Sequence, residues 1–342
     1  MSAALFGYLP DGQPVHRITL SGHGLTATIL DYGAIVQDLR LQGHQPALVL
    51  GFHQLDDYLQ HSPYFGAIAG RCANRIRDGL VQLDGQRFEL DRNFLGKHCL
   101  HGGSAGMGKR LWRLDDTTTT AVTLTISLAD GDMGFPGNLT ARVTYQLMPG
   151  GTLDIVMEAT TDQLTLCNLA HHSYFNLDGS SSILDHRLQV LAQHYNPVDG
   201  ELIPTGEIRP VADTQMDLRQ QQALVETGDE GRTAGRRLLD HNFCLSRQRA
   251  ALRHVATLAS PLSGVSMRLH TTEPGLQIYT GGKINCPVPG LDGMVMGANS
   301  GIAMEPQTWP DGIHQPQFPQ ATLQPGEQYL QHTQYIFDKE QP

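Results

Sequence analysis

The sequence predicts an all-β protein, built as a large antiparallel β-sandwich with few short helices. Three observations lead to this prediction: short runs that alternate apolar and polar residues, frequent turn signals between them, and little helical spacing. The chain has 342 residues. Because large sandwiches and barrels of about 200–250 residues commonly form one domain, we expect residues 1–342 to form a single domain.

The clearest predicted strand is Val122–Leu128, which has the period of two that is typical of a half-buried strand. Four other runs share this pattern: Leu153–Met157, Arg187–Leu191, Val265–Leu269 and Leu276–Thr280. Turn signals separate such runs, among them Asp84-Gly85, Pro149–Gly151, Asp199-Gly200, Pro289-Gly290 and Pro325-Gly326. This punctuation favours hairpin-connected strands over alternating strands and helices.

Helical spacing is confined to three short segments, near residues 54–60, 64–76 and 217–226. The polar segment 226–237 contains three glycines and is predicted to be an exposed loop rather than a boundary between domains. We therefore expect the helices to be minor additions to the β-structure.

Composition narrows the classes of partner. The chain carries 24 Lys+Arg against 34 Asp+Glu, a net charge of −10, which disfavours nucleic acid or an anionic membrane as a partner. No apolar run approaches the roughly 18–20 residues of a membrane span, and the first residues do not have the pattern of a signal peptide. We expect a cytoplasmic protein that works as a monomer or homodimer.

The cysteines predict neither disulfides nor a zinc site. Their number is odd and no two form a C-x-x-C pair, so they are expected to be reduced and mostly buried: Cys72, Cys99, Cys167, Cys244 and Cys286.

Polar residues gather in five places where a plain sandwich would not need them. Together they offer His, Glu, Asp, Asn, Arg and an aromatic ring, a set that suits a neutral polyol ligand such as a sugar. The five segments are Gly70–Ile76, His98–Gly103, His171–Leu177, Leu239–Phe243 and Ala303–Asp311.

Histidine pairs leave a metal site open as an alternative. His98 and His101 are three residues apart, and His171 and His172 are adjacent. Adjacent residues on a strand point to opposite faces, so at most one of the second pair can serve a single site. With no H-E-x-x-H motif and no cysteine pair nearby, we expect no metal. The motifs of phosphate-binding loops are also missing, so nucleotide binding has no support.

With these segments in view, nearly the whole chain resembles the aldose 1-epimerase (galactose mutarotase) family. That resemblance implies an all-β sandwich of the galactose mutarotase-like type. The segments that carry it, in order, are Gly66–Ile76 (GAIAGRCANRI), Leu100–Gly103 (LHGG), Asn168–Leu177 (NLAHHSYFNL), Pro197–Ile208 (PVDGELIPTGEI), Asp240–Phe243 (DHNF), Pro274–Gly281 (PGLQIYTG) and Glu305–Pro319 (EPQTWPDGIHQPQFP).

The resemblance also implies an activity: the interconversion of the α and β anomers of free aldohexoses such as galactose and glucose. Glu305 would be the general base at the anomeric hydroxyl, His172 the general acid at the ring oxygen, and His101 a hydrogen-bond partner near that oxygen. No metal or organic cofactor is implied. The residues implied to bind sugar hydroxyls are Asn74, Arg75, Asp240 and Gln277.

The reaction independently requires such a set. Opening the ring needs one group to accept the hydroxyl proton while another donates a proton to the ring oxygen, and closing it on the other face reverses the roles. One carboxylate and one imidazole therefore suffice.

The chain departs from the family pattern at three positions. Pro306 follows the implied base, Gly282 stands where relatives often have Asn, and so does His171. Two further side chains keep two interpretations each: Trp309 as a sugar-stacking platform or as core, and Arg71 inside or outside the pocket.

Three other functions remain open from sequence alone. One is a sugar-binding module without catalysis, for which loss of the acid or the base would be expected. Another is an epimerase of hexose 6-phosphates, for which Arg71 and Arg75 leave some room. The last is a zinc-dependent enzyme.

Overall fold

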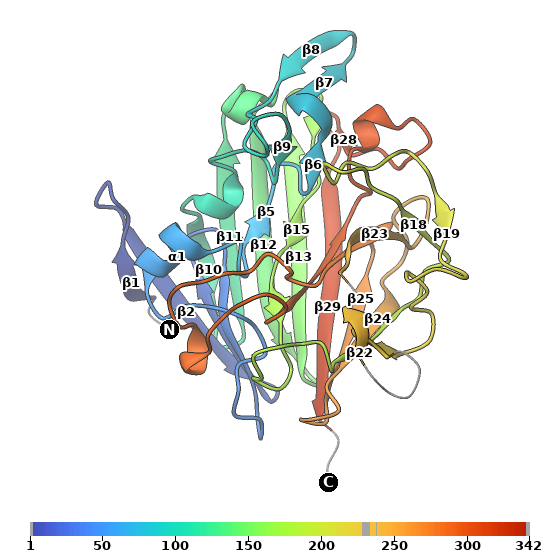
Figure 1. Ribbon diagram of the computed structural model, residues 1–342. Helices are drawn as coiled ribbons and strands as arrows, with labels where there is room; N and C mark the ends of the chain where they lie inside the picture. The colour runs from blue at the N-terminus through green and yellow to red at the C-terminus, as the bar shows by residue number, and fades with distance from the viewer. Residues whose placement is uncertain (1–2, 228–232, 237, 340–342) are drawn as a thin grey trace.

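The computed structural model describes residues 3–227, 233–236 and 238–339. Its largest element is a nine-stranded antiparallel sheet, whose long strands β12, β13 and β29 run side by side in Figure 1. In spatial order this sheet contains β10 (Arg113–Thr117), β11 (Ala121–Leu128), β12 (Leu139–Met148), β13 (Thr152–Thr161), β29 (Tyr329–Lys339), β25 (Val265–Thr271), β24 (Arg253–Ala259), β17 (Arg187–Val190) and β20 (Gln222–Ala223).

Two smaller sheets accompany it. The six-stranded sheet has the order β16 (Tyr174–Phe175), β27 (Ile302–Gln307), β26 (Gly275–Tyr279), β23 (Asp240–Cys244), β18 (His194–Asn196) and β19 (Arg209–Pro210). The four-stranded sheet consists of β1 (Ala4–Tyr8), β2 (Pro14–Gly22), β3 (Leu25–Leu30) and β4 (Val36–Leu41).

Five two-stranded pairs complete the described strands. They are β5 (Ile68–Ala69) with β15 (Ala170–His171), β6 (Arg75–Ile76) with β9 (Cys99–Leu100), β7 (Leu80–Leu83) with β8 (Gln86–Glu89), β14 (Thr165–Leu166) with β28 (Thr322–Leu323), and β21 (Val225–Thr227) with β22 (Thr233–Arg236). All of these strand pairs are antiparallel.

The hydrophobic core lies between the nine- and six-stranded sheets. Alternate residues of β12, such as Val143 and Tyr145, are fully buried and belong to the same cluster as Leu276, Ile302 and Met304 of the smaller sheet. The period of two then turns Gln277 and Glu305 to the opposite face of the smaller sheet. That face carries the candidate site.

The predicted fold class is confirmed. All five runs with alternating residues form strands, namely β11, β13, β17, β25 and β26, and the structural neighbours reported below have the same fold. The single-domain organisation stays a prediction.

One of the three predicted helices is present and two predictions were wrong. Segment 54–60 corresponds to α1 (Leu55–His61). Segment 64–76 instead holds β5 and β6, because positive φ angles at Tyr64, Gly66 and Asn74 break any helix. Segment 217–226 holds β20, which pairs with β17. No helix in the described ranges has the length and hydrophobicity needed to cross a membrane.

The predicted loop 226–237 was wrong in part. Its described residues belong to the β21–β22 pair, in which Val225 lies opposite Arg236. Residues 228–232 and 237 lie outside the described ranges, so the loop prediction stands untested for them.

Candidate active site

A cavity of about 220 Å³ lies over the polar face of the six-stranded sheet. It is lined by all seven residues that the family resemblance singled out, although they are spread over more than 230 positions of the chain (305 − 74 = 231). Those residues are Asn74, Arg75, His101, His172, Asp240, Gln277 and Glu305. Four separate strands and three connecting segments contribute them.

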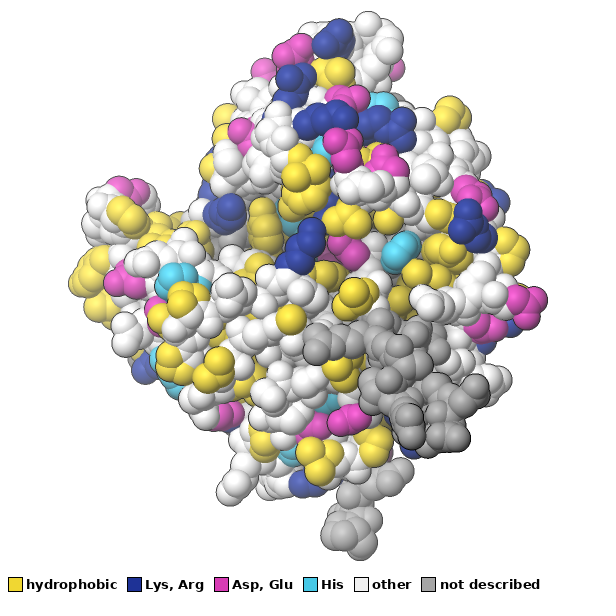
Figure 2. Space-filling view, in the orientation of Figure 1, with side chains coloured by type: hydrophobic (Ala, Val, Ile, Leu, Met, Phe, Trp, Pro, Cys, Tyr) yellow, Lys and Arg dark blue, Asp and Glu magenta, His cyan; other side chains and the backbone are white. Residues whose placement is uncertain are grey.

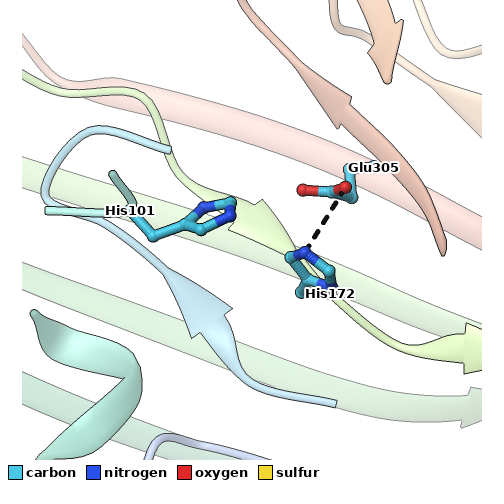
Figure 3. A group of neighbouring side chains, drawn as sticks. All are labelled: His101, His172 and Glu305. Atoms are coloured by element: carbon cyan, nitrogen blue, oxygen red, sulfur yellow. Dashed lines mark ion pairs between the residues drawn. The ribbon is translucent and has the colours of Figure 1, made fainter. Parts of the chain in front are cut away.

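Three of these side chains converge at the floor of the cavity (Figure 3). Nε2 of His172 lies 3.5 Å from Oε1 of Glu305, and the His101 ring lies 5.1 Å from the His172 ring. All three side chains are buried, with Glu305 only 2% exposed. A carboxyl group and an imidazole are thus held 3.5 Å apart and shielded from solvent.

Glu305 is placed by β27, whose six residues are all buried. Pro306 is tolerated in this strand because its backbone N position faces away from the paired strand β26. Its carbonyl oxygen accepts a hydrogen bond from Nε2 of Gln331 at 2.8 Å, and the N–H and C=O of one strand residue point to the same side. The missing N–H of Pro306 therefore faces Gln331, and pairing of β27 with β26 is undisturbed.

His172 is placed by the segment between β15 and β16. Its backbone N–H donates to the carbonyl of Ala67, and its own carbonyl accepts from Gly66. The adjacent His171 points the other way, where its ring packs against those of Tyr145 and Tyr335. Of the two adjacent histidines, only His172 lines the cavity, as expected for neighbours that point to opposite faces.

His101 is placed by the turn after β9, where it adopts a φ of 51°. The backbone N–H of Asn74 donates to its Nδ1 at 3.2 Å, and its own N–H donates back to the Asn74 carbonyl at 3.0 Å. Because Nδ1 accepts, the proton of the neutral ring is on Nε2. His101 is therefore fixed as a hydrogen-bond donor.

That donor role bears on metal binding. His101, His172 and Glu305 offer potential ligand atoms within 4.8 Å of one another. A metal needs an unprotonated ring nitrogen, yet Nδ1 of His101 is engaged by the Asn74 N–H and Nε2 carries the proton. The hydrogen bonding thus disfavours a three-ligand metal site, and the expectation that no metal is needed stays a prediction.

The remaining polar groups form one hydrogen-bonded group along the wall. Nη2 of Arg75 lies 3.3 Å from Oδ2 of Asp240, and Nε2 of Gln277 donates to Oδ1 of Asp240 at 2.6 Å. Oδ1 of Asn74 accepts the backbone N–H of Arg75. Nε of Arg75 and Oε2 of Glu305 are buried and have no partner among the described residues. A polyol in the cavity can satisfy both.

Burial sets the protonation state of the Glu305–His172 pair. It raises the pKa of Glu305 to about 8, with a smaller contribution from the charge of Asp240 that Arg75 opposes. It lowers the pKa of His172 to about 4, and that of His101 well below its usual value. Near neutral pH the Glu305–His172 pair therefore holds one proton.

Three side chains that the sequence left open lie outside the cavity lining. Arg71 is buried and donates to the carbonyls of Pro136 and Gly137. Trp309 packs against Phe318 in the core, so a role in sugar stacking is not supported. His98 accepts the backbone N–H of Asp78 and contacts Glu201, so it does not act with His101.

Sequence reasoning assigned no role to the aromatic wall of the cavity, formed by Tyr64, Phe94, Tyr174 and Tyr279. The ring of Tyr64 lies 4.6 Å from that of His101, and Phe94 lies under the guanidinium of Arg75 at 4.7 Å. Tyr174 and Tyr279 stand inside two of the motifs quoted above, which was the available signal. Tyr64 stood in a segment wrongly predicted to be helical, which obscured it.

Comparison with known proteins places the chain in a family. A sequence profile described as aldose 1-epimerase matches residues 16–336. The chain belongs to the aldose 1-epimerase family. It is 40% identical to the galactose mutarotase of Mus musculus, with 98% of each chain covered. It is 33% identical to the aldose 1-epimerase of Escherichia coli, with 96% of each covered.

Solved structures of aldose 1-epimerase homologues also superpose on this chain over nearly its whole length. An aldose epimerase homologue from C. elegans superposes with a TM-score of 0.88 at 31% identity, covering 96% of this chain and 100% of that one. A galactose 1-epimerase from Lactobacillus acidophilus reaches 0.82 at 26% identity, covering 99% of each. The resemblance drawn from the sequence motifs is thereby confirmed.

The turn that carries His101 yields a stability prediction. Gly102 has a φ of +82°, and a Cβ there would overlap the backbone carbonyl of Gly70. Gly131 has a φ of +77° with open space around it. We expect Gly131→Ala to lose about 1–2 kcal/mol of unfolding free energy from the left-handed conformation alone. Gly102→Ala should lose more, because the overlap adds to that cost.

Chemical denaturation of both variants beside the wild type measures the two losses. Equal losses would contradict the close approach of Gly102 to Gly70.

Proposed function

We propose that this protein is an aldose 1-epimerase that interconverts the α and β anomers of free aldohexoses such as galactose and glucose. The observation that carries the proposal is the buried pair of His172 and Glu305, 3.5 Å apart, in a cavity walled by hydrogen-bonding groups and aromatic rings. Family membership over the whole chain supports it.

In the proposed mechanism, the anomeric hydroxyl of the sugar donates to Glu305 and the ring oxygen accepts from His172. In the free protein the proton of the pair is on Glu305, because burial raises its pKa to about 8 and lowers that of His172 to about 4. We propose that the anomeric hydroxyl, by donating to the carboxylate, favours transfer of this proton to His172 before the ring opens. Glu305 takes the hydroxyl proton as His172 protonates the ring oxygen, and the ring opens. Rotation about C1–C2 and ring closure with the roles exchanged give the other anomer.

His101 and the wall residues have supporting roles in this mechanism. The Nε2 proton of His101 is available to the ring oxygen, where charge develops as the bond breaks. Asp240, Gln277, Arg75 and Asn74 bind hydroxyl groups of the sugar and hold C1 in line with the acid–base pair. The residues supply both proton transfers, and we propose that no metal or cofactor takes part.

A hexose 6-phosphate is a poorer fit. Arg71 is engaged outside the cavity, and Arg75 is already paired with Asp240. Lys283 is the remaining cation that lines the cavity within the described residues, and it is exposed. On the face shown in Figure 2, basic and acidic side chains are interspersed, without the concentrated positive charge that favours a dianion.

A cytoplasmic location, a monomeric or homodimeric state, and the absence of nucleic-acid and membrane partners remain proposals. The net charge of −10 supports the absence of nucleic-acid and anionic-membrane partners.

The activity is tested by polarimetry of freshly dissolved α-D-galactose and α-D-glucose with chelator-treated protein. We expect faster decay to the unchanged equilibrium rotation. Glu305→Gln should keep the fold and sugar binding but lower kcat about 100-fold or more, because the base is lost. His172→Gln should lower kcat similarly.

Trp309→Phe serves as a control outside the cavity. A wild-type protein that binds galactose by calorimetry without accelerating mutarotation would instead leave a sugar-binding module. Loss of the acceleration on chelation would point to a metal.

The pH dependence follows from the paired pKa values. Activity requires one proton on the Glu305–His172 pair. As pH falls below about 4, the pair gains a second proton, on His172, and can no longer accept one. As pH rises above about 8, the pair loses its remaining proton, from Glu305, and can no longer donate one. We expect a bell-shaped profile of kcat/KM with these limbs. A profile that stays flat from pH 5 to beyond pH 9 would contradict it.

A further inference from the structure

The strand that carries Glu305 is fastened on both sides of that residue to the nine-stranded sheet. The carbonyl of Met304 accepts the hydroxyl proton of Tyr335 at 3.1 Å, and the carbonyl of Pro306 accepts from Nε2 of Gln331 at 2.8 Å. The pairing of β27 with β16 covers only Ile302 and Ala303. Side chains of β29 thus donate hydrogen bonds to the carbonyls of β27 that lie beyond the β16 pairing.

The Tyr335 link continues to the segment that carries His172. The hydroxyl of Tyr335 has one proton, which it gives to Met304, so it accepts from Nδ1 of His171 at 3.4 Å. Nε2 of His171 then accepts from the hydroxyl of Ser173 at 3.0 Å. Burial lowers the pKa of His171 to about 3, which keeps the ring neutral as this chain requires. The two residues that flank His172 are therefore tied to the residue before Glu305.

The Gln331 link reaches Leu169, three residues before His172, by a second route. Oε1 of Gln331 accepts from the hydroxyl of Tyr329 at 2.9 Å, and that hydroxyl accepts the backbone N–H of Leu169 at 3.0 Å. Tyr329, Gln331 and Tyr335 alternate on the inner face of β29 and are at most 2% exposed. Two separate chains of buried hydrogen bonds therefore connect the two catalytic segments.

We propose that Tyr335 and Gln331 are positioning residues that set the separation between Glu305 and His172. This inference rests on the proposed function, since it assumes that those two residues transfer the protons. Neither Tyr335 nor Gln331 lines the cavity, so each acts through the backbone beside Glu305. His171 joins them as the neutral link to the His172 segment.

The consequence is geometric. Without the hydrogen bond from Tyr335, the buried carbonyl of Met304 has no hydrogen-bond partner. The strand β27 is then free to shift so that this carbonyl finds another donor. A displacement of about 1 Å in a catalytic group can lower a rate by about 100-fold. Because the sugar-binding groups stand on other strands and loops, such a shift affects proton transfer more than sugar binding.

The test is Tyr335→Phe, which removes one hydroxyl and keeps the ring. We expect kcat to fall about 10-fold with KM within about twofold of wild type, since only the reacting geometry changes. The upper limb of the kcat/KM profile should move to lower pH, because a looser Glu305 is better hydrated.

Tyr58→Phe is the matched control. Its hydroxyl is also buried and accepts the backbone N–H of Phe52, and its ring packs against Phe6 and Phe52 rather than against His171 or Tyr335. We expect this variant to lose stability without a change in kcat or in the pH profile.

Gln331→Met tests the second route independently and covers the case in which Tyr335→Phe does not fold. It should give the same pattern of lowered kcat and preserved KM. The inference is overturned if the folded variants keep kcat within twofold of wild type, or if Tyr58→Phe lowers kcat as much as Tyr335→Phe does. Failure of the proposed function would be visible separately, as a wild-type protein that does not accelerate mutarotation.

Discussion

The site depends on one constraint, the burial of a carboxyl group beside an imidazole. In water, Glu305 would be ionised and His172 partly protonated near neutral pH. In the closed floor of the cavity, both charged forms are disfavoured, so the pair keeps a single proton over a wide pH range. A pair with one proton can give and take protons in the same turnover, which a reversible ring opening requires.

The register of the six-stranded sheet makes that burial possible without exposing the core. Glu305 lies opposite Gln277, Gln277 opposite Asn242, and Asn242 opposite Asn196, so polar side chains form a row across four strands. The alternate residues, among them Met304, fill the hydrophobic core. A slip of one residue would exchange the two sets, which ties the position of the site to the stability of the fold.

Three buried histidines have different tasks because each has different partners. Asn74 fixes His101 as a donor through Nε2, whereas Tyr335 and Ser173 fix His171 with its proton on Nδ1. His172 alone faces a carboxylate. Burial keeps all three rings uncharged near neutral pH in the free protein, and of the three only His172 is proposed to take up a proton during turnover.

The sequence by itself determined the β-rich class, through the period of two in runs such as Val122–Leu128. Its resemblance to the aldose 1-epimerase family also pointed to the seven polar residues that line the cavity, although not to the aromatic wall. It did not determine which face each side chain takes where a strand is buried on both sides, as β27 is, because uniform burial hides the period. Only the tertiary structure assigned Arg71 and Trp309 to structural roles and joined Arg75 to Asp240. These contacts link residues far apart along the chain, and no local pattern specifies which distant groups will meet.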